Sequence, residues 1–251
     1  MEISHNTNRS VDKGLTIGLI LLALSICFAG FMIAGGMKEF RAADRSVNMK
    51  GLSQKDVEAD LAIWTIKHTA TGNDLSAVQA TIKNNGQKIR NFLQANNLGD
   101  RDIAGRRLEV TDLLAQAYRQ NGATDSRYII SEIIAIRSAN VNAVDAAYQK
   151  SGDLLEQDVS LIVEQNQSPV DYIFTGLNDI KPEMIAEATR SAREAAEQFA
   201  ADSGASIGGI RNAYQGVFQI LPRDSDNAYQ ERNSRYKTVR VVSTINFNIE
   251  D

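Results

Sequence analysis

The longest apolar run of the chain extends from Gly14 to Met37 and contains no charged residue. About 20 helical residues span a hydrocarbon core of about 30 Å, whereas the apolar part of a cleaved signal peptide usually has about 7–15 residues. The run therefore predicts a short head at residues 1–13 and an uncleaved transmembrane signal anchor at 14–37. Two alternatives stay open, which are a cleaved signal ending at the small residues Ala34-Gly35-Gly36 and a helix buried in a soluble protein.

The charges that flank the run bear on its orientation. Arg9 and Lys13 precede it, and four cations follow it: Lys38, Arg41, Arg45 and Lys50. This count favours a cytoplasmic C-terminal flank, but large domains translocate largely regardless of charge. Because a short head before a long body is typical of a signal anchor, we expect the body on the outer side of the membrane.

Beyond the anchor, short periodic segments predict alternating strands and helices. From Val57 to Ile66 apolar residues first alternate with acids and then occupy both faces, which is typical of a strand that runs from an exposed edge into a covered region. Asp74 is a helix N-cap candidate, and a stripe of apolar residues follows at helical spacing: Leu75, Val78, Ile82, Ile89, Phe92 and Leu93. Asn96 to Gly99 ends this helix.

The next segments continue the pattern. Extended stretches are expected at Ile103–Ala117 and Arg127–Ser138, with Asn121-Gly122 as a hairpin signal between them. Asn140 begins a second helix that continues to Leu155, and Val159–Glu164 is expected to form a short strand. The order over residues 57–164 is therefore strand–helix–strand–strand–helix–strand.

A third helix and two long strands follow. After a short extended piece at Tyr172, the segment Asn178–Glu183 predicts a helix start. The helix should continue over Met184–Ala201 and end at Gly204, with this buried stripe: Ile185, Ala188, Ala192, Ala195, Ala196 and Phe199. Extended segments at Ile207–Leu221 and Tyr236–Ile249 are separated by an exposed polar loop, residues 223–234.

These elements define an α+β fold class. An N-terminal transmembrane helix precedes a body at 45–251, made of a βαββαβ part, one helix and two long antiparallel C-terminal strands. We expect subunits at about 45–165 and 166–251.

Composition excludes several classes of function. A net charge of −4 and a pI of about 5.4 argue against a nucleic-acid partner. The chain has two histidines and one cysteine, which are too few for a Cys/His zinc site, a disulfide framework or a redox pair of cysteines. Cys27 is not a lipidation site, because bulky Ile26 precedes it and the apolar run continues after it, so we expect a membrane-helix residue.

Three stretches carry a resemblance to a known family. They are Val47–Gly51 with the following KDVEADLAIWTIKHTATG, then YIFTGLNDIKPEMIAEATRSAREAAEQFAADSG, and IGGIRNAYQG with the terminal strand YKTVRVVSTINFNI. The chain resembles the SIMPL-domain (YggE-like) family of bacterial envelope proteins over about 45–251. The resemblance implies an α+β body outside the inner membrane, hence in the periplasm, and roles in oxidative-stress defence. It also implies assembly, since at least one relative forms a ring-like homo-oligomer.

Two candidate sites involve acidic residues. Asp56, Glu58 and Asp60 share one face of a predicted strand, with His68 farther along it. Three acids can bind a hard cation, but alternate strand residues lie about 6.6 Å apart, so we interpret them as a solvated strand start and His68 as a strand-end residue. Asp224-Ser225-Asp226-Asn227 resembles a calcium loop, but Tyr229 stands where such a loop needs glycine and Ala228 where it needs a ligand.

Two further motifs also have simpler interpretations. Gly204-Ala205-Ser206-Ile207-Gly208 matches the hydrolase nucleophile elbow, but that elbow needs a strand before the serine and a helix after it. The predicted order is the reverse, so we interpret the motif as a helix stop and turn. The helix predicted over Met184–Ala201 has a charged face that could contact a partner or solvent. Its oppositely charged i,i+4 pairs favour solvent. The residues of this face are Glu187, Arg190, Arg193, Glu194 and Glu197.

The sequence therefore predicts no catalytic, cofactor-binding or metal-binding residue. We expect a non-enzymatic, membrane-anchored envelope protein that contacts lipid through residues 14–37 and acts by homo-oligomeric assembly or partner binding. The small residues of the anchor and the open edges of the predicted sheets in the body favour assembly. The alternative is a periplasmic enzyme or stress factor whose site is assembled from scattered residues.

Overall fold

The computed structural model describes residues 9–43, 45–115, 126–163, 168–225 and 227–250. The chain forms two compact units, each assembled from separate stretches of sequence. Unit 1 contains residues up to Gly51, Ala188–Gly216 and residues from Ser243 onward; unit 2 contains Leu52–Glu187 and Val217–Val242. The predicted subunits 45–165 and 166–251 are each continuous in sequence, whereas the observed units are interleaved.

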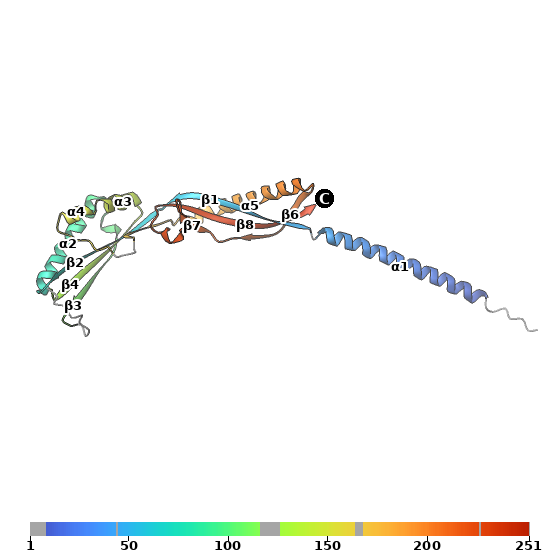
Figure 1. The fold of residues 1–251 in the computed structure, drawn as a ribbon, viewed down its shortest axis with the longest axis horizontal. Helices are drawn as coiled ribbons and strands as arrows, with labels where there is room; N and C mark the ends of the chain where they lie inside the picture. Colours follow the sequence, from blue (N-terminus) through green and yellow to red (C-terminus); the bar gives the residue numbers. More distant parts are fainter. Residues whose placement is uncertain (1–8, 44, 116–125, 164–167, 226, 251) are drawn as a thin grey trace, which may run out of the picture. The chain divides into compact units, whose positions relative to one another are not determined.

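In unit 1 the apolar run is helical. Helix α1 (Arg9–Ala43) contains a stretch, Gly14–Ile33, that is long and apolar enough to cross a membrane (Figure 1). All side chains of this stretch are exposed. A helix that exposes apolar side chains all round fits a lipid environment, so α1 fits a membrane anchor or a signal sequence.

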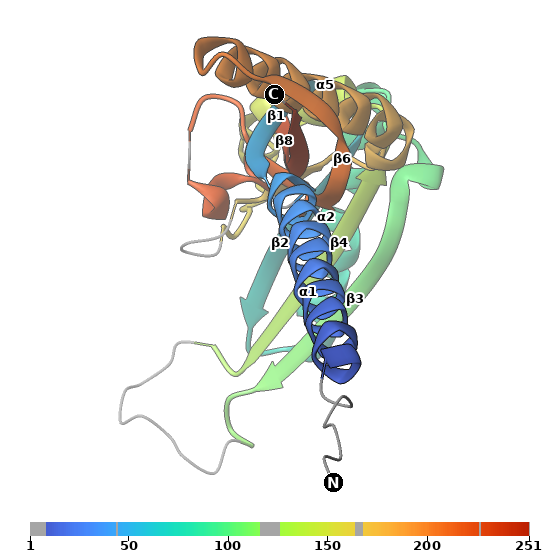
Figure 2. The same ribbon diagram turned by 90° about the vertical axis from the view of Figure 1, so that its right-hand side faces the viewer.

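Unit 1 also contains the C-terminal part of a helix that packs on parts of three strands. The strands lie in the order β1 (Ser46–Glu58), β8 (Tyr236–Glu250) and β6 (Ser206–Gln215). Helix α5 (Leu177–Asp202) lies along one face of this sheet (Figure 2). The core consists of Val47, Ala192, Ala196, Ile245 and Phe247. The predicted terminal strand is confirmed, but β8 lies between β1 and β6, so it offers no open edge there.

The buried row of α5 is narrower than the predicted stripe. Every fourth residue is buried: Met184, Ala188, Ala192, Ala196 and Ala200. Ile185 is only half-buried, and Ala195 and Phe199 are exposed, so these three predictions were wrong. A row with a spacing of four forms one ridge of a helix, and small residues on it let the sheet approach closely.

At Gly51, strand β1 lies close against the backbone of α5. A Cβ atom placed on Gly51 would lie 1.9 Å from the carbonyl oxygen of Ala188 and 2.4 Å from the amide nitrogen of Ala192. Gly204 follows the same helix with a φ of 71°, in the left-handed region that glycine tolerates best. The predicted helix end at Gly204 is confirmed.

Unit 2 contains an antiparallel sheet of four strands. Their order is β3 (Ile103–Asp112), β4 (Tyr128–Ser138), β2 (Leu61–Gly72) and β5 (Val170–Ile173). Helix α2 (Leu75–Ala95) packs on β2 and β4, and α3 (Val141–Gln149) packs on β2. The main core includes Trp64, Ile66, Ile89, Ile134 and Val144.

The helix starts of unit 2 are confirmed. The Asp74 carboxylate accepts hydrogen bonds from the amides of Ser76 and Ala77, at 2.8 Å and 3.1 Å, and so caps α2. The Asn140 side chain caps α3 in the same way, through the amide of Ala143. The predicted stripe of α2 is buried apart from Leu75, which lies in the first turn and is exposed.

Several predicted helices and strands of unit 2 are interrupted or shorter in the structure. The strand predicted from Val57 is interrupted at Ala59 and Asp60, because the amides of these two residues bind carbonyl groups of Arg235 and Ile173 instead of continuing one ladder. The helix predicted to continue from Asn140 to Leu155 is divided into α3 and a short α4 (Gly152–Leu155).

Of the strand predicted at Val159–Glu164, the described residues 159–163 form only an isolated bridge between Leu161 and His68, and Glu164 lies outside the described residues. The final strand of the βαββαβ part is β5, which covers most of the short extended piece expected around Tyr172. The predicted Asn121-Gly122 turn lies outside the described residues.

The segment Ile207–Leu221 forms two strands rather than one. After β6, a short break precedes β7 (Gln219–Pro222), which pairs with β8 in antiparallel register. The polar loop after β7 is largely exposed as predicted and contains a single turn of 3-10 helix, Ala228–Gln230. The amide of Tyr172 donates to the carbonyl of Arg232 at 2.7 Å, so the loop is attached to β5.

Candidate functional site

A buried cluster of charged and polar side chains joins three neighbouring strands of unit 2. Glu132 on β4 lies directly opposite His68 on β2, and its Oε2 atom is 2.9 Å from His68 Nε2. Arg106 on β3 donates from Nε to the other carboxylate oxygen at 2.9 Å. The side chains of His68 and Glu132 are 0% and 3% exposed, whereas Arg106 is 40% exposed and reaches solvent.

This cluster contains groups that could take part in acid–base chemistry. His68 Nδ1 is buried and has no hydrogen-bond partner, and α2 closes over the carboxylate, since a Cβ atom on Gly86 would lie 2.6 Å from Glu132 Oε2. However, none of the three side chains lines the unit 2 pockets of about 540, 460 and 370 Å³. The contacts of the cluster join β2, β3 and β4, and we assign it to the pairing of these strands.

The prediction that His68 is a strand-end residue was wrong. His68 lies inside β2 on its buried face, with Trp64 and Ile66. The sequence did contain a signal for the cluster, because Glu132 interrupts a row of isoleucines on the buried face of β4. A carboxylate at such a position needs a partner, but a single sequence does not show which cation supplies it.

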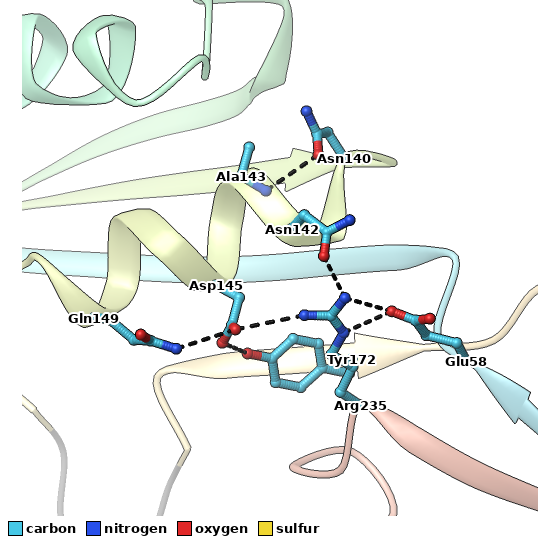
Figure 3. A network of polar contacts seen from close by, with 8 residues as sticks. All are labelled: Glu58, Asn140, Asn142, Ala143, Asp145, Gln149, Tyr172 and Arg235. Atoms are coloured by element: carbon cyan, nitrogen blue, oxygen red, sulfur yellow. Dashed lines mark hydrogen bonds and ion pairs between the residues drawn. The ribbon is translucent and has the colours of Figure 1, made fainter.

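A second polar network surrounds Arg235, shown in Figure 3. Its guanidinium donates from Nε to Glu58 at 2.7 Å and also binds the side-chain oxygen of Asn142. A third nitrogen lies 3.5 Å from Asp145, whose other carboxylate oxygen accepts a 2.8 Å hydrogen bond from the Tyr172 hydroxyl. Arg235 thus connects the end of β1 with α3, and Asp145 extends the network to β5.

Burial and the neighbouring Asp145 carboxylate raise the pKa of Tyr172 above its ordinary value. The hydroxyl therefore keeps its proton and remains a donor to Asp145 well into the alkaline range. The Arg235 side chain is only 21% exposed, and its polar partners Glu58, Asn142 and Asp145 come from two different elements, so the network is a structural connection between elements. Neither Arg235 nor Tyr172 was singled out by the sequence.

The three acids near the end of β1 do not come together. Asp56 accepts a hydrogen bond from the Thr238 hydroxyl at 2.6 Å, and Glu58 binds Arg235. Asp60 accepts from the amides of Thr175 and Gly176. Among the described residues no group of three or more His, Cys, Asp or Glu side chains is placed to hold a metal ion.

The Gly-x-Ser-x-Gly motif lies where α5 ends and β6 begins. Ser206 is the first residue of β6, and its hydroxyl donates to the carbonyl of Glu250 at 3.3 Å. A helix therefore precedes the serine and a strand follows it, opposite to the order in a nucleophile elbow. The interpretation as a helix stop and turn is confirmed.

The calcium-like loop and the charged helix face have protein partners. Asp224 pairs with Arg223 at 3.0 Å, and this hydrogen bond lowers the pKa of Asp224; Asp226 lies outside the described residues. On α5, Glu187 accepts a 2.6 Å hydrogen bond from the Ser53 hydroxyl. Arg193 lies 5.3 Å from the ring centre of Phe247 in unit 1. All five residues of the predicted charged face are nevertheless exposed, in agreement with a solvent-facing helix surface.

An exposed sheet edge is the surface feature of unit 2 that most favours a partner. β3 pairs with β4 along one edge, and within the described part of the chain no strand pairs with the other. Leu108 and Val110 on β3 are 59% and 58% exposed. The register with β4 is regular from Gly105 to Asp112, whereas β6 has two register shifts of the kind that protect an edge.

A comparison with models of protein families identifies a match. Residues 47–245 match a family model described as "SIMPL: Protein of unknown function (DUF541)". The match begins in β1 and ends in β8, so it includes strands of both units. The search of curated proteins found no match for the chain.

Proposed function

The chain belongs to the SIMPL family, and from this premise we propose that it is a membrane-anchored envelope protein whose body assembles with further copies of itself. The apolar α1 helix supports the anchor. We place the body in the periplasm of a bacterial cell. The proposal includes a contribution to envelope or oxidative-stress defence and assigns no catalytic residue.

The unpaired edge of β3 is the observation that carries the assembly proposal. An exposed strand edge is a template for pairing with another chain. Leu108 and Val110 add exposed apolar surface on this edge strand. An anchor also confines copies to one membrane plane and so raises their effective concentration.

The sequence of β3 is complementary to itself in an antiparallel pair. If two copies pair with Leu108 opposite Leu108, then Arg107 of each lies opposite Glu109 of the other. Opposite charges and apolar pairs across strands both stabilise a sheet, and such a contact has the two-fold symmetry of common homodimers. We therefore place the symmetry axis of the proposed contact at Leu108.

Register-specific disulfide formation tests this proposal. Cys27 is replaced by serine in the full-length chain, and Leu108→Cys is added. In the proposed register the two Cα atoms at position 108 lie about 4.5–5.5 Å apart, within the usual range for a disulfide. Mild oxidation in detergent should therefore produce a covalent dimer on a non-reducing gel.

The matched control is Val110→Cys in the same Cys27→Ser background. It is equally exposed, but in the proposed register it lies opposite Arg106 of the other copy and should cross-link poorly. Equal cross-linking at both positions would indicate random collision. A purely monomeric native mass spectrum of the full-length protein would contradict assembly itself.

A further inference from the structure

In unit 2, one face of strand β1 is covered by α5 and the other is open. Alternate side chains of a strand point to opposite faces, and Ser53 and Lys55 on β1 bind glutamates of α5. Gln54 and Asp56 alternate with them and are exposed on the other face. They line a pocket of about 460 Å³ together with residues of β7 and β8. This volume lies within the range of roughly 300–1,000 Å³ typical of small-molecule sites.

The side chains of this pocket form two rows across the strands. Strands β1 and β8 are antiparallel, since the residue just after β1 donates to the carbonyl of the residue just before β8 at 2.9 Å. The Thr238 hydroxyl donates to Asp56 at 2.6 Å, so these two residues form one row. In the same register Gln54 lies opposite Arg240. Because alternate residues of a strand are about 6.6 Å apart, this distance separates the two rows.

Arg240 is a donor without an acceptor in the described part of the chain. Its Nε atom is buried and has no hydrogen-bond partner, and none of the described residues forms an ion pair with its guanidinium. Arg223 also lines the pocket, but Asp224 already accepts from its guanidinium. A guanidinium is a planar fork of donors that matches a carboxylate. Arg240 is therefore the cation that a ligand carboxylate can bind without displacing a described partner.

The other row supplies hydrogen-bond acceptors. Asp56 accepts from Thr238 through one oxygen, and a carboxylate has about four lone-pair sites, so it can accept further bonds. The Gln54 carboxamide both accepts and donates. In the described lining only Leu221 and Pro222 are apolar, so a ligand is held here mainly by hydrogen bonds. Hydroxyl groups are the ligand donors that fit these acceptors.

From these features we propose that unit 2 binds a small hydroxy acid of the sugar-acid type in this pocket. The carboxylate binds Arg240, and hydroxyl groups farther along the ligand donate to Asp56 and Gln54. An extended ligand of this kind reaches from one row to the other, and its carboxylate then lies away from Asp56, which carries the same charge. The inference goes beyond assembly and is independent of it, since the pocket and the edge of β3 belong to different sheets.

A ligand-detected NMR titration tests the proposal. The full-length protein is placed in phosphatidylcholine nanodiscs at pH 7.5, and empty nanodiscs give the background. Gluconate is compared with two ligands of equal carbon number: sorbitol, which has the hydroxyls but no charge, and hexanoate, which has the carboxylate but no hydroxyls. We expect saturable gluconate binding that weakens with added salt. Sorbitol and hexanoate should each bind about tenfold more weakly, because each lacks one set of contacts.

Variants locate the binding. Arg240→Gln should weaken gluconate about tenfold and leave sorbitol unchanged, whereas Asp56→Ala should weaken sorbitol and leave hexanoate no weaker. A general structural defect would weaken all three ligands alike. Arg190→Gln is the matched control, because Arg190 is an exposed arginine on α5 outside the pocket. The proposal is overturned by no saturable gluconate binding, by equal affinity for the three ligands, or by equal effects of Arg240→Gln and Arg190→Gln.

Discussion

At the residue scale, Glu132 shows what a buried charge does in this sheet. Its carboxylate accepts from His68 on one side and Arg106 on the other, so a single acidic residue connects three strands. Removing one member of a buried charged group leaves the others without compensation. The alternation of apolar residues along β4 indicates that position 132 is buried. It does not identify His68 and Arg106 as partners of Glu132, because they lie on other strands that are distant in the sequence.

We predict that Glu132→Gln destabilises unit 2. The variant keeps the size of the side chain but loses the negative charge that pairs with Arg106, and its amide nitrogen cannot accept a hydrogen bond from His68, so the free energy of unfolding should fall by about 2–4 kcal/mol. Urea unfolding of the full-length protein can be followed by the fluorescence of Trp64. This residue is the single tryptophan of the chain and is 2% exposed in the same core.

The control for this experiment is Glu183→Gln on α5. Glu183 also pairs with a cation, Lys55, but the pair is exposed, so its loss should change the free energy of unfolding by less than about 0.5 kcal/mol. Similar small losses in both variants would show that the buried cluster contributes no more than a surface ion pair.

At the scale of helices and strands, local sequence signals predicted where helices begin better than where strands are interrupted. Asp74 and Asn140 cap helices as expected, because a cap depends on one side chain and the amides next to it. The break between β1 and β2 was missed, because the apolar alternation continues through Ala59 and Asp60. Their amides bind carbonyls of Arg235 and Ile173, and contacts between residues so far apart leave no periodic signal.

The contact between β1 and α5 in unit 1 gives a second prediction. At Gly51 an added Cβ atom would overlap the backbone of α5, and backbone cannot move aside as a flexible side chain can. Gly51→Ala should therefore lower the free energy of unfolding of unit 1 by about 1–3 kcal/mol. Thermal denaturation of the full-length protein, followed by circular dichroism, measures this effect.

Gly209→Ala is the matched control in the same unit. Gly209 lies in β6, and a Cβ atom there would meet nothing within 4 Å. An alanine in a strand interior is slightly favoured over glycine, so the melting temperature should stay the same or rise. If both variants melted alike, the close approach at Gly51 would not limit packing.

At the scale of the whole molecule, the anchor remains a prediction that fractionation can test. The exposed apolar stretch Gly14–Ile33 should keep the protein in the membrane pellet after an alkaline carbonate wash. Mass spectrometry of the pellet should detect peptides from this stretch. A soluble species that starts near Met37 would show that the stretch is a cleaved signal.

A matched variant carries Leu22→Arg and Leu24→Arg in the middle of the stretch. Each arginine at a helix centre costs about 2.5–3.5 kcal/mol on insertion, so this variant should leave the pellet. Protease added to the periplasmic side of spheroplasts should digest the body of the unaltered protein. Protection of the body would reverse the proposed orientation.

The division into two units could not be read along the sequence. Periodicity predicted α5 and β8 as single long elements, which they are, whereas it did not predict β1 as one strand. Each of these three elements contributes residues to both units. A change of unit inside a continuous helix or strand alters neither its spacing of apolar residues nor its capping, so no local pattern marks it.

The interleaved units also impose an order on biosynthesis. The ribosome completes α1 and the first half of β1 early, but unit 1 also needs Ile245 and Phe247 of β8 for its core. At 5–20 residues per second the intervening chain takes roughly 10–40 s to synthesise. The unit that begins first is therefore completed last, and during this interval its apolar strand must wait unpaired for residues that have not yet left the ribosome.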